Sequence, residues 1–157
     1  MSDKRYWLMK SEPDEFSIDD LAASEHQTTR WEGVRNYQAR NFMRDDMKLG
    51  DKIFFYHSNA NPLAIVGICE VASEPYPDPS QFDPESDYFD PKSTEENPRW
   101  ILVDVKLVEK FKNPVLRDEI REQPELQDMM LIKKGSRLSI QPVQEHEWEK
   151  VMQMAGK

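Results

Sequence analysis

Short β-prone apolar runs, joined by turns and irregular segments, set the pattern of this chain. They cover residues 6–9, 52–56, 63–71, 100–108 and 137–140. The connections lack the regular strand–helix alternation of a doubly wound sheet, and successive runs are mostly neighbours in sequence. The pattern therefore predicts an α+β domain built on a strongly curved or barrel-like, mainly antiparallel sheet that is flanked by short helices.

Helix signals lie between and after these runs. Ser17, with Asp20 three residues later, is typical of a capped helix start, and Asn36 is a suitable N-cap. Apolar residues recur at helical spacing after Asn36 and again near the C-terminus. Helices are expected over residues 17–21, 36–47, 115–122 and 144–154.

Two segments are expected to be loops. Residues 24–35 are polar, and residues 75–98 contain six prolines and many acidic side chains, which predicts a long, exposed loop. The hydrophobic core should contain Cys69, as a buried thiol, and three tryptophans. These are Trp7, Trp100 and Trp148.

The composition fits one domain over residues 1–157, because 38% hydrophobic residues suffice for a core. No stretch approaches the roughly 18 apolar residues that a membrane helix needs, and the N-terminus does not resemble a signal peptide. One cysteine forms no internal disulfide or cysteine-based zinc site. We therefore expect a cytoplasmic monomer with no membrane partner, no cofactor and no metal.

The net charge of −9 argues against a protein that coats nucleic acid through phosphate contacts alone. The charge is nevertheless uneven. Residues 30–48 carry five basic and three acidic side chains, whereas residues 78–96 carry seven acidic side chains and one lysine. This distribution describes either two solvated faces of opposite sign or one face that attracts anions.

Polar residues at a strand end provide the first candidate site. Lys10, Ser11 and Glu12 follow the first apolar run, and Pro13 ends it. They describe either a solvated strand end or the wall of a pocket, since binding sites are common beyond strand ends.

The segment WEGVRNYQARN, residues 31–41, is the second candidate. Trp31 stands in a loop beside Gly33, where its ring can lie over a planar ligand, and the Asn36 amide can pair with the edge of a base. The simpler alternatives are that Trp31 packs on the core and that Asn36 only caps the helix.

Two further segments carry polar residues next to strands. In the first, Tyr56, His57 and Ser58 end a strand, and a structural role for His57 is the simpler interpretation. A Ser–His nucleophile is disfavoured because adjacent strand residues point to opposite faces. In the second, strand alternation places Arg137 and Ser139 on one face, which also fits an ordinary amphipathic strand.

These segments together resemble the EVE domain family of the PUA-like superfamily. The similarity covers nearly the whole chain, in the family's order. Its motifs are WLMKSEP (7–13), WEGVRNYQARN (31–41), GD (50–51), FYHS (55–58), GI (67–68), YPD (76–78), DPKS (90–93), PRW (98–100) and SRLSIQPV (136–143).

The resemblance implies a PUA-like fold and a non-enzymatic pocket that holds a modified nucleobase, either a modified cytosine in DNA or a modified RNA base. Trp31 is the candidate stacking residue, and Ser11, Asn36 and Ser58 are candidates for contacts with the base edge. The candidate phosphate contacts are Lys10, Arg35 and Arg40. The remaining candidate ligand-binding residues are Glu12, Val34, Tyr37, Asn41, Tyr56, His57, Arg137 and Ser139.

Two other functions stay open. Distant PUA-like relatives of the ASCH type resemble hydrolases that act on an acylated nucleobase, and Lys10, Ser11 and Glu12 form a loosely similar set. The acidic loop could instead serve a protein-interaction module. We expect no catalytic residues.

Overall fold

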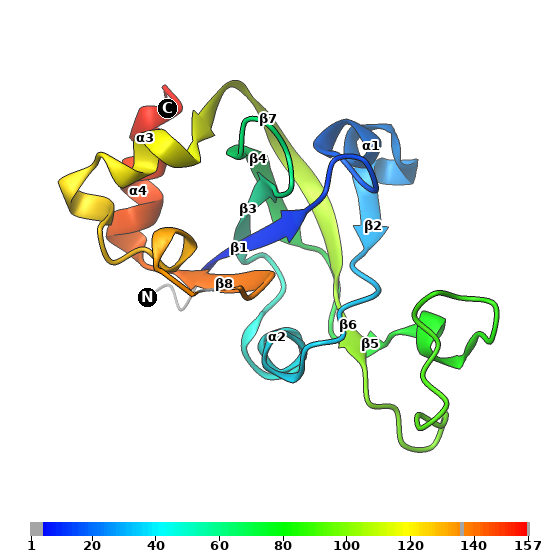
Figure 1. Ribbon diagram of the computed structural model, residues 1–157. Coiled ribbons are helices and arrows are strands. Elements are labelled where there is room, and N and C mark those ends of the chain that lie inside the picture. The colour runs from blue at the N-terminus through cyan, green and yellow to red at the C-terminus, as the bar shows by residue number, and fades with distance from the viewer. Residues whose placement is uncertain (1–4, 136, 157) are drawn as a thin grey trace.

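The computed structural model describes residues 5–135 and 137–156, and its central element is one curled, mixed sheet of six strands (Figure 1). The strand order is β2-β7-β4-β3-β1-β8, with β1 and β3 parallel and the other neighbours antiparallel. The strands are β1 (Tyr6–Ser11), β2 (Thr28–Arg30), β3 (Lys52–His57), β4 (Ala64–Val71), β7 (Asp104–Leu116) and β8 (Ile140–Val143). The expected α+β class and curled sheet are confirmed.

Short helices cover both faces of the sheet. Figure 1 shows α3 and α4 together on one side, and α1 with β2 on the other. The α-helices are α1 (Ile18–Ala23), α2 (Tyr37–Asn41), α3 (Arg117–Arg121) and α4 (Glu145–Met154), and α2 continues into the π-helical turn η2 (Phe42–Asp46). The 3-10 turns are η1 (Glu25–Gln27), η3 (Pro79–Phe82), η4 (Pro124–Leu126) and η5 (Met130–Ile132).

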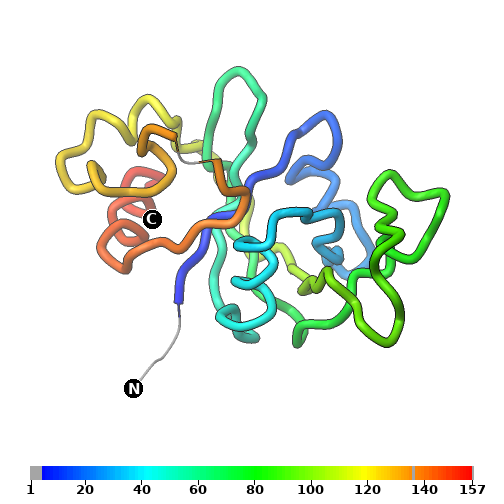
Figure 2. The backbone as a smooth tube through the Cα atoms, turned by 60° about the horizontal axis from the view of Figure 1, so that its bottom comes forward, coloured from blue at the N-terminus to red at the C-terminus, as the bar shows by residue number. Residues whose placement is uncertain are grey.

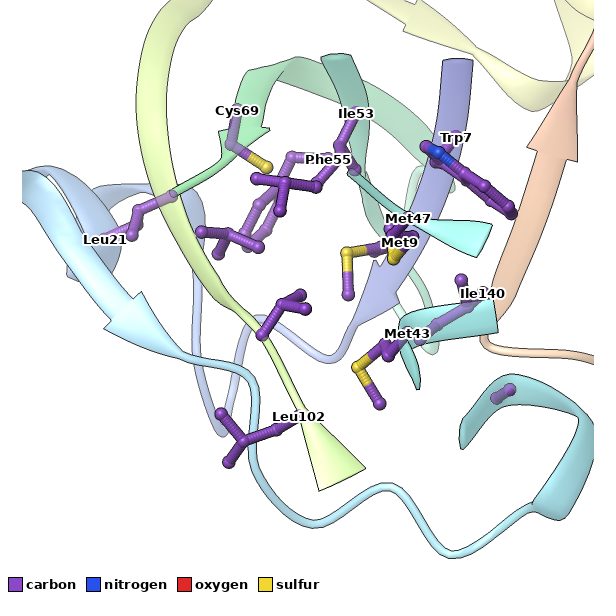
Figure 3. Close-up of a cluster of buried hydrophobic side chains, with 14 of the residues drawn as sticks. Trp7, Met9, Leu21, Met43, Met47, Ile53, Phe55, Cys69, Leu102 and Ile140 are labelled. Carbon is purple, nitrogen blue, oxygen red and sulfur yellow. The ribbon is translucent and has the colours of Figure 1, made fainter. Parts of the chain in front are cut away.

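The strands β1, β3 and β4 are buried on both faces, which explains why they are continuous apolar runs. Trp7 and Met9 of β1 pack into one core with Phe55, whereas Leu8 and Phe54 pack into a second core. Figure 3 shows the first core, with side chains from β1, β3, β4, β8 and the turn η2 converging. Trp7 and Cys69 lie in the first core and Trp148 in the second, and Trp100 is buried as predicted.

The helix starts predicted at Ser17 and Asn36 are confirmed. The Ser17 hydroxyl accepts from the Asp20 N–H at 3.1 Å, and the Asp20 carboxylate accepts from the Ser17 N–H at 2.8 Å. Asn36 Oδ1 accepts from the Ala39 N–H at 3.0 Å. The C-terminal helix is also present, as α4.

Irregular pairing curls the sheet at its centre. The β4–β7 register shifts on both sides of Gly67, where the Ile18 side chain and the Glu109 carbonyl crowd the backbone. A Cβ atom at Gly67 would lie 2.4 Å from that carbonyl oxygen, so only glycine fits. This approach brings the start of α1 against the sheet.

Three element boundaries differ from the sequence prediction. The segment 24–35 contains β2, an edge strand of three residues that is too short to show a period. The strand expected over 100–108 is divided: β6 (Ile101–Leu102) belongs to a separate two-stranded sheet, and β7 begins at Asp104 and continues to Leu116. β2 pairs with only the first three residues of β7. No strand therefore lies beside Pro114 on the β2 side of β7, where its missing N–H would leave a gap in the hydrogen-bond ladder. The helix α3 begins at Arg117 rather than at 115.

The last strand also starts later than expected, at Ile140 instead of 137. It forms an edge of the sheet, paired to β1 alone, and so tolerates Pro142 opposite Trp7. Arg137 and Ser139 precede this strand, so the prediction that strand alternation puts them on one face is wrong.

The proline-rich segment is not exposed throughout. It contains β5 (Tyr76–Pro77), which pairs with β6 (Ile101–Leu102), and the turn η3. The Gln81 side chain is fully buried: its amide nitrogen donates to the Asp78 and Trp100 carbonyls, and its oxygen accepts from the Arg99 and Trp100 N–H groups. Figure 2 shows residues 78–98, in green, as a loop at the opposite end of the molecule from α4. No helix within the described ranges is long and apolar enough to cross a bilayer.

Candidate functional site

The parallel pairing of β1 with β3 creates the site. Ser11 lies in register with His57, so the segments that follow both strands emerge at the same edge of the sheet. The Ser58 N–H donates to the Ser11 carbonyl at 3.0 Å, and the Lys10 N–H donates to the Ser139 carbonyl at 2.8 Å. Three segments distant in sequence therefore form one rim.

A cavity of about 600 Å³ opens at this rim, which is within the usual size of a small-molecule site. It is lined by Lys10, Ser11, Glu12, Glu15, Phe16, Thr29, Arg30, Trp31, Glu32, Gly33, Val34, Arg35, Ser58, Tyr88, Arg137 and Ser139. The candidate segments around Lys10, Trp31, Ser58 and Arg137 thus meet in space. Ser136, which begins the last of them, lies outside the described residues.

Trp31 forms one wall of the cavity. Its backbone N–H donates to the Val103 carbonyl at 3.0 Å, and its ring meets the Phe55 ring edge to face at a centroid distance of 5.8 Å. The indole is half-buried against the first core while it still lines the cavity. Core packing and ligand contact, which were alternatives for Trp31, are therefore compatible.

Tyr88, from the proline-rich segment, forms another part of the wall. Its ring packs against Gly33, which has a φ of +87°. A Cβ atom at Gly33 would lie 2.7 Å from Tyr88 Cζ, so a side chain there would displace the ring. The Gly33 N–H also donates to Asp78 Oδ2 at 2.8 Å.

Arg35 connects the basic segment to the acidic one. Its guanidinium donates to the Tyr88 carbonyl at 2.6 Å and to Ser80 Oγ at 3.2 Å, and it lies 3.3 Å from Asp78 Oδ2. The two oppositely charged segments are therefore in contact. The structure gives Arg35 a role in holding the loop that carries Tyr88, and its phosphate contact stays a prediction.

The other predicted residues of α2 lie outside the cavity lining. Asn36 caps the helix, Tyr37 stacks on Trp100 at 4.8 Å, and the Arg40 guanidinium lies 4.7 Å above the Tyr37 ring. Arg40 also donates to the Arg99 carbonyl and to Asn41 Oδ1, each at 2.7 Å. Their direct contact with a ligand stays a prediction.

Tyr56 and His57 also lie outside the cavity lining. Tyr56 is buried in the second core, where burial raises its pKa. His57 Nε2 accepts the Ile18 N–H at 3.1 Å, so this nitrogen carries no proton, and burial lowers the pKa of His57. His57 thus secures the first turn of α1 next to the cavity.

The cavity is electrostatically unlike the rest of the chain. Four basic side chains (Lys10, Arg30, Arg35 and Arg137) and three acidic ones (Glu12, Glu15 and Glu32) line it, a balance of +1 in a chain of net charge −9. Burial, with a smaller contribution from Arg117, lowers the pKa of Lys10. No group of three or more His, Cys, Asp or Glu side chains among the described residues could hold a metal ion.

Several lining residues were not found from the sequence. Glu15 and Phe16 follow the predicted strand end by a few positions and could have been included with it. Tyr88 carried no local signal, because it lies 53 positions beyond Arg35, which holds it. Thr29 and Arg30 were missed because β2 was assigned to a loop.

Comparisons with known proteins agree with this architecture. The EVE domain family matches residues 5–154. The chain is 45% identical to thymocyte nuclear protein 1 of Gallus gallus over 95% of this chain and 68% of that protein. It is also similar to the crystal structure of human thymocyte nuclear protein 1 in complex with DNA that contains 5-methylcytosine, at a TM-score of 0.92 and 42% identity, with 98% of this chain and 99% of that chain covered.

A more distant likeness, to a mutant of the ASCH protein of Zymomonas mobilis, has a TM-score of 0.55 and 8% identity over 96% of this chain and 99% of that one. It shows a shared fold and nothing more. The family match and the close relatives decide the classification: this chain has the PUA-like EVE fold and belongs to the EVE domain family.

Proposed function

We propose that this protein holds a modified cytosine of DNA in the cavity between Trp31 and Tyr88, and that it binds the base without converting it. The observation that carries the proposal is the similarity over 98% of the chain to a relative crystallised with DNA that contains 5-methylcytosine. A modified base in RNA is the second candidate, because the same pocket chemistry serves either nucleic acid.

The cavity wall suits a flipped base. Extruding a base from a duplex costs a few kcal/mol, and stacking on an aromatic ring returns roughly 1–3 kcal/mol per base. Trp31 and Tyr88 supply rings from two separate segments. Carboxylates accept hydrogen bonds from the cytosine amino group, and Glu12, Glu15 and Glu32 line the same cavity.

The hydrolase alternative has less support from the geometry. The Ser11 hydroxyl donates to the Phe16 carbonyl at 2.5 Å, so it is engaged with backbone rather than with a base that could activate it. Among the described residues, Lys10 and Glu12 form no ion pair with each other. The ASCH likeness extends to the fold alone.

A panel of modified nucleosides and oligonucleotides tests binding and turnover together. The protein is incubated with methylated, hydroxymethylated and acetylated bases, affinities are measured, and the recovered bases are analysed by mass spectrometry. We expect selective binding with every base recovered unchanged. Loss of a modified base that Lys10→Ala or Glu12→Gln abolishes would overturn the proposal in favour of the hydrolase.

A further inference from the structure

A second hollow adjoins the base cavity. The two share Lys10, Glu12 and Arg137, and the far wall of the second hollow is the β3–β4 turn with Asn59 and Asn61. Lys10 therefore stands where one hollow passes into the other, so a group bound in the second would lie next to a base bound in the first.

Basic side chains without ion-pair partners among the described residues lie close together where the two hollows meet. The Arg117 N–H donates to the Leu63 carbonyl at 2.9 Å, which brings the start of α3 to the same turn. Burial lowers the pKa of Lys10, and the positive charge of Arg117 lowers it further. Arg137 is exposed and lines both hollows.

These three cations differ from the other basic residues nearby. Arg30 pairs with Glu32, Arg35 with Asp78 and Lys110 with Asp19. Over residues 5–135 and 137–156, by contrast, Lys10, Arg117 and Arg137 have no ion pair or side-chain hydrogen bond. Like charges held together without partners in an acidic protein repel one another, and a bound anion relieves that repulsion.

We propose that the second hollow is a phosphate subsite for the phosphodiester that flanks the flipped base. Lys10 and Arg137, which line the hollow, bind this group, and Arg117, which is hydrogen-bonded to Leu63 of its wall, binds it from beside the hollow. Phosphate contacts fix the position of a nucleic acid while base contacts provide specificity. The Asn59 and Asn61 amides add neutral donors at the far wall. The inference rests on the proposed function, because it assigns the anion by its place beside the base.

The salt dependence of binding tests this subsite. Affinity for a single-stranded oligonucleotide is measured at several salt concentrations for the wild type, Lys10→Gln, Arg117→Gln and Arg137→Gln. Each substitution should reduce the log–log slope by about 0.7, the value for one lost phosphate contact in a single strand. Lys112→Gln is the matched control, since Lys112 is exposed, lines neither hollow and, unlike Arg117, does not affect the pKa of Lys10.

A nucleoside that lacks phosphate separates this site from the base site. Arg117 does not line the base cavity, so Arg117→Gln should leave the affinity for free 5-methyl-2′-deoxycytidine unchanged and weaken binding of its 3′- and 5′-monophosphates. Thermal unfolding establishes that each variant is folded.

The outcomes are distinct. Slopes of the three variants that match the Lys112→Gln slope would overturn the phosphate subsite, as would equal losses of nucleoside and nucleotide affinity in Arg117→Gln. Equal wild-type affinity for methylated and unmethylated oligonucleotides, with the slopes still reduced, would overturn the base proposal and leave the phosphate subsite supported.

Discussion

The backbone N–H of Gly33 donates a 2.8 Å hydrogen bond to the carboxylate of Asp78, which is 45 positions further along the chain. The Asp78 side chain is 2% exposed and also accepts from the Ser80 N–H and hydroxyl. One buried carboxylate thus joins the segment that carries Trp31 to the segment that carries Tyr88.

Asp78→Ala should separate these two walls. The substitution leaves the Gly33 and Ser80 donors without their acceptor, and an unsatisfied buried donor costs about 1–3 kcal/mol. We expect a lower free energy of unfolding in chemical denaturation and weaker binding of the modified base. Asp83→Ala, in the same loop, is the control; a similar loss of binding in both variants would contradict the role assigned to Asp78.

Gly33→Ala should displace Tyr88. A positive φ strains any side chain by about 1–2 kcal/mol, and the added Cβ would also meet the Tyr88 ring. Gly50→Ala is a matched control, because Gly50 has a φ of +90° with no atom within 4 Å of its Cβ position. Both variants should lose stability, but only Gly33→Ala should lose about tenfold in affinity for the modified base. Equal affinities of the two variants would show that Tyr88 does not contribute.

His57 should make the stability of the fold depend on pH. Its neutral Nε2 accepts the Ile18 N–H, and burial lowers its pKa below the ordinary value of about 6.5. The unfolded chain therefore takes up this proton first as the pH falls. The stabilisation is complete above pH about 6.5 and is lost as the pH falls through the lowered folded-state pKa.

Thermal unfolding at pH 7.5 and 5.5 measures this effect. The fall in Tm should be smaller in His57→Gln than in the wild type, whereas the exposed His146→Gln should keep the wild-type fall. An identical fall in Tm for wild type and His57→Gln would mean that the Ile18 contact contributes nothing.

Much of the fold could be predicted from the sequence because local signals agreed with the tertiary structure. Ser17 and Asn36 cap helices as their types and spacing indicate. The boundaries that failed depended on partners elsewhere in the chain. β2 exists because β7 pairs with it, and the extension of β7 past Pro114 depends on the free side of that strand.

The site could be predicted only in part for the same reason. Lys10 and Ser58 were found because each follows an apolar run, Arg137 because it begins one, and Trp31 because it is a large aromatic beside Gly33. The structure brings the four to one cavity. Tyr88 was missed because its position depends on Arg35, whose contacts with the acidic loop no local pattern indicates. The uneven charge along the chain indicated either two solvated faces of opposite sign or one face that attracts anions, whereas in the folded protein Arg35 pairs the basic segment with the acidic one.

The affinity ratio between two single-stranded oligonucleotides that differ only in one cytosine methyl group tests the central claim most directly. Burial of the methyl group contributes about 0.8 kcal/mol, so the wild type should prefer the methylated strand by about fourfold or more. Trp31→Ala should bind the methylated strand roughly 5- to 150-fold more weakly, as expected for the loss of 1–3 kcal/mol of stacking. Its affinity for the unmethylated strand should fall far less. Equal wild-type affinities for the two strands, or equal losses for both in Trp31→Ala, would contradict a modified-base pocket at Trp31.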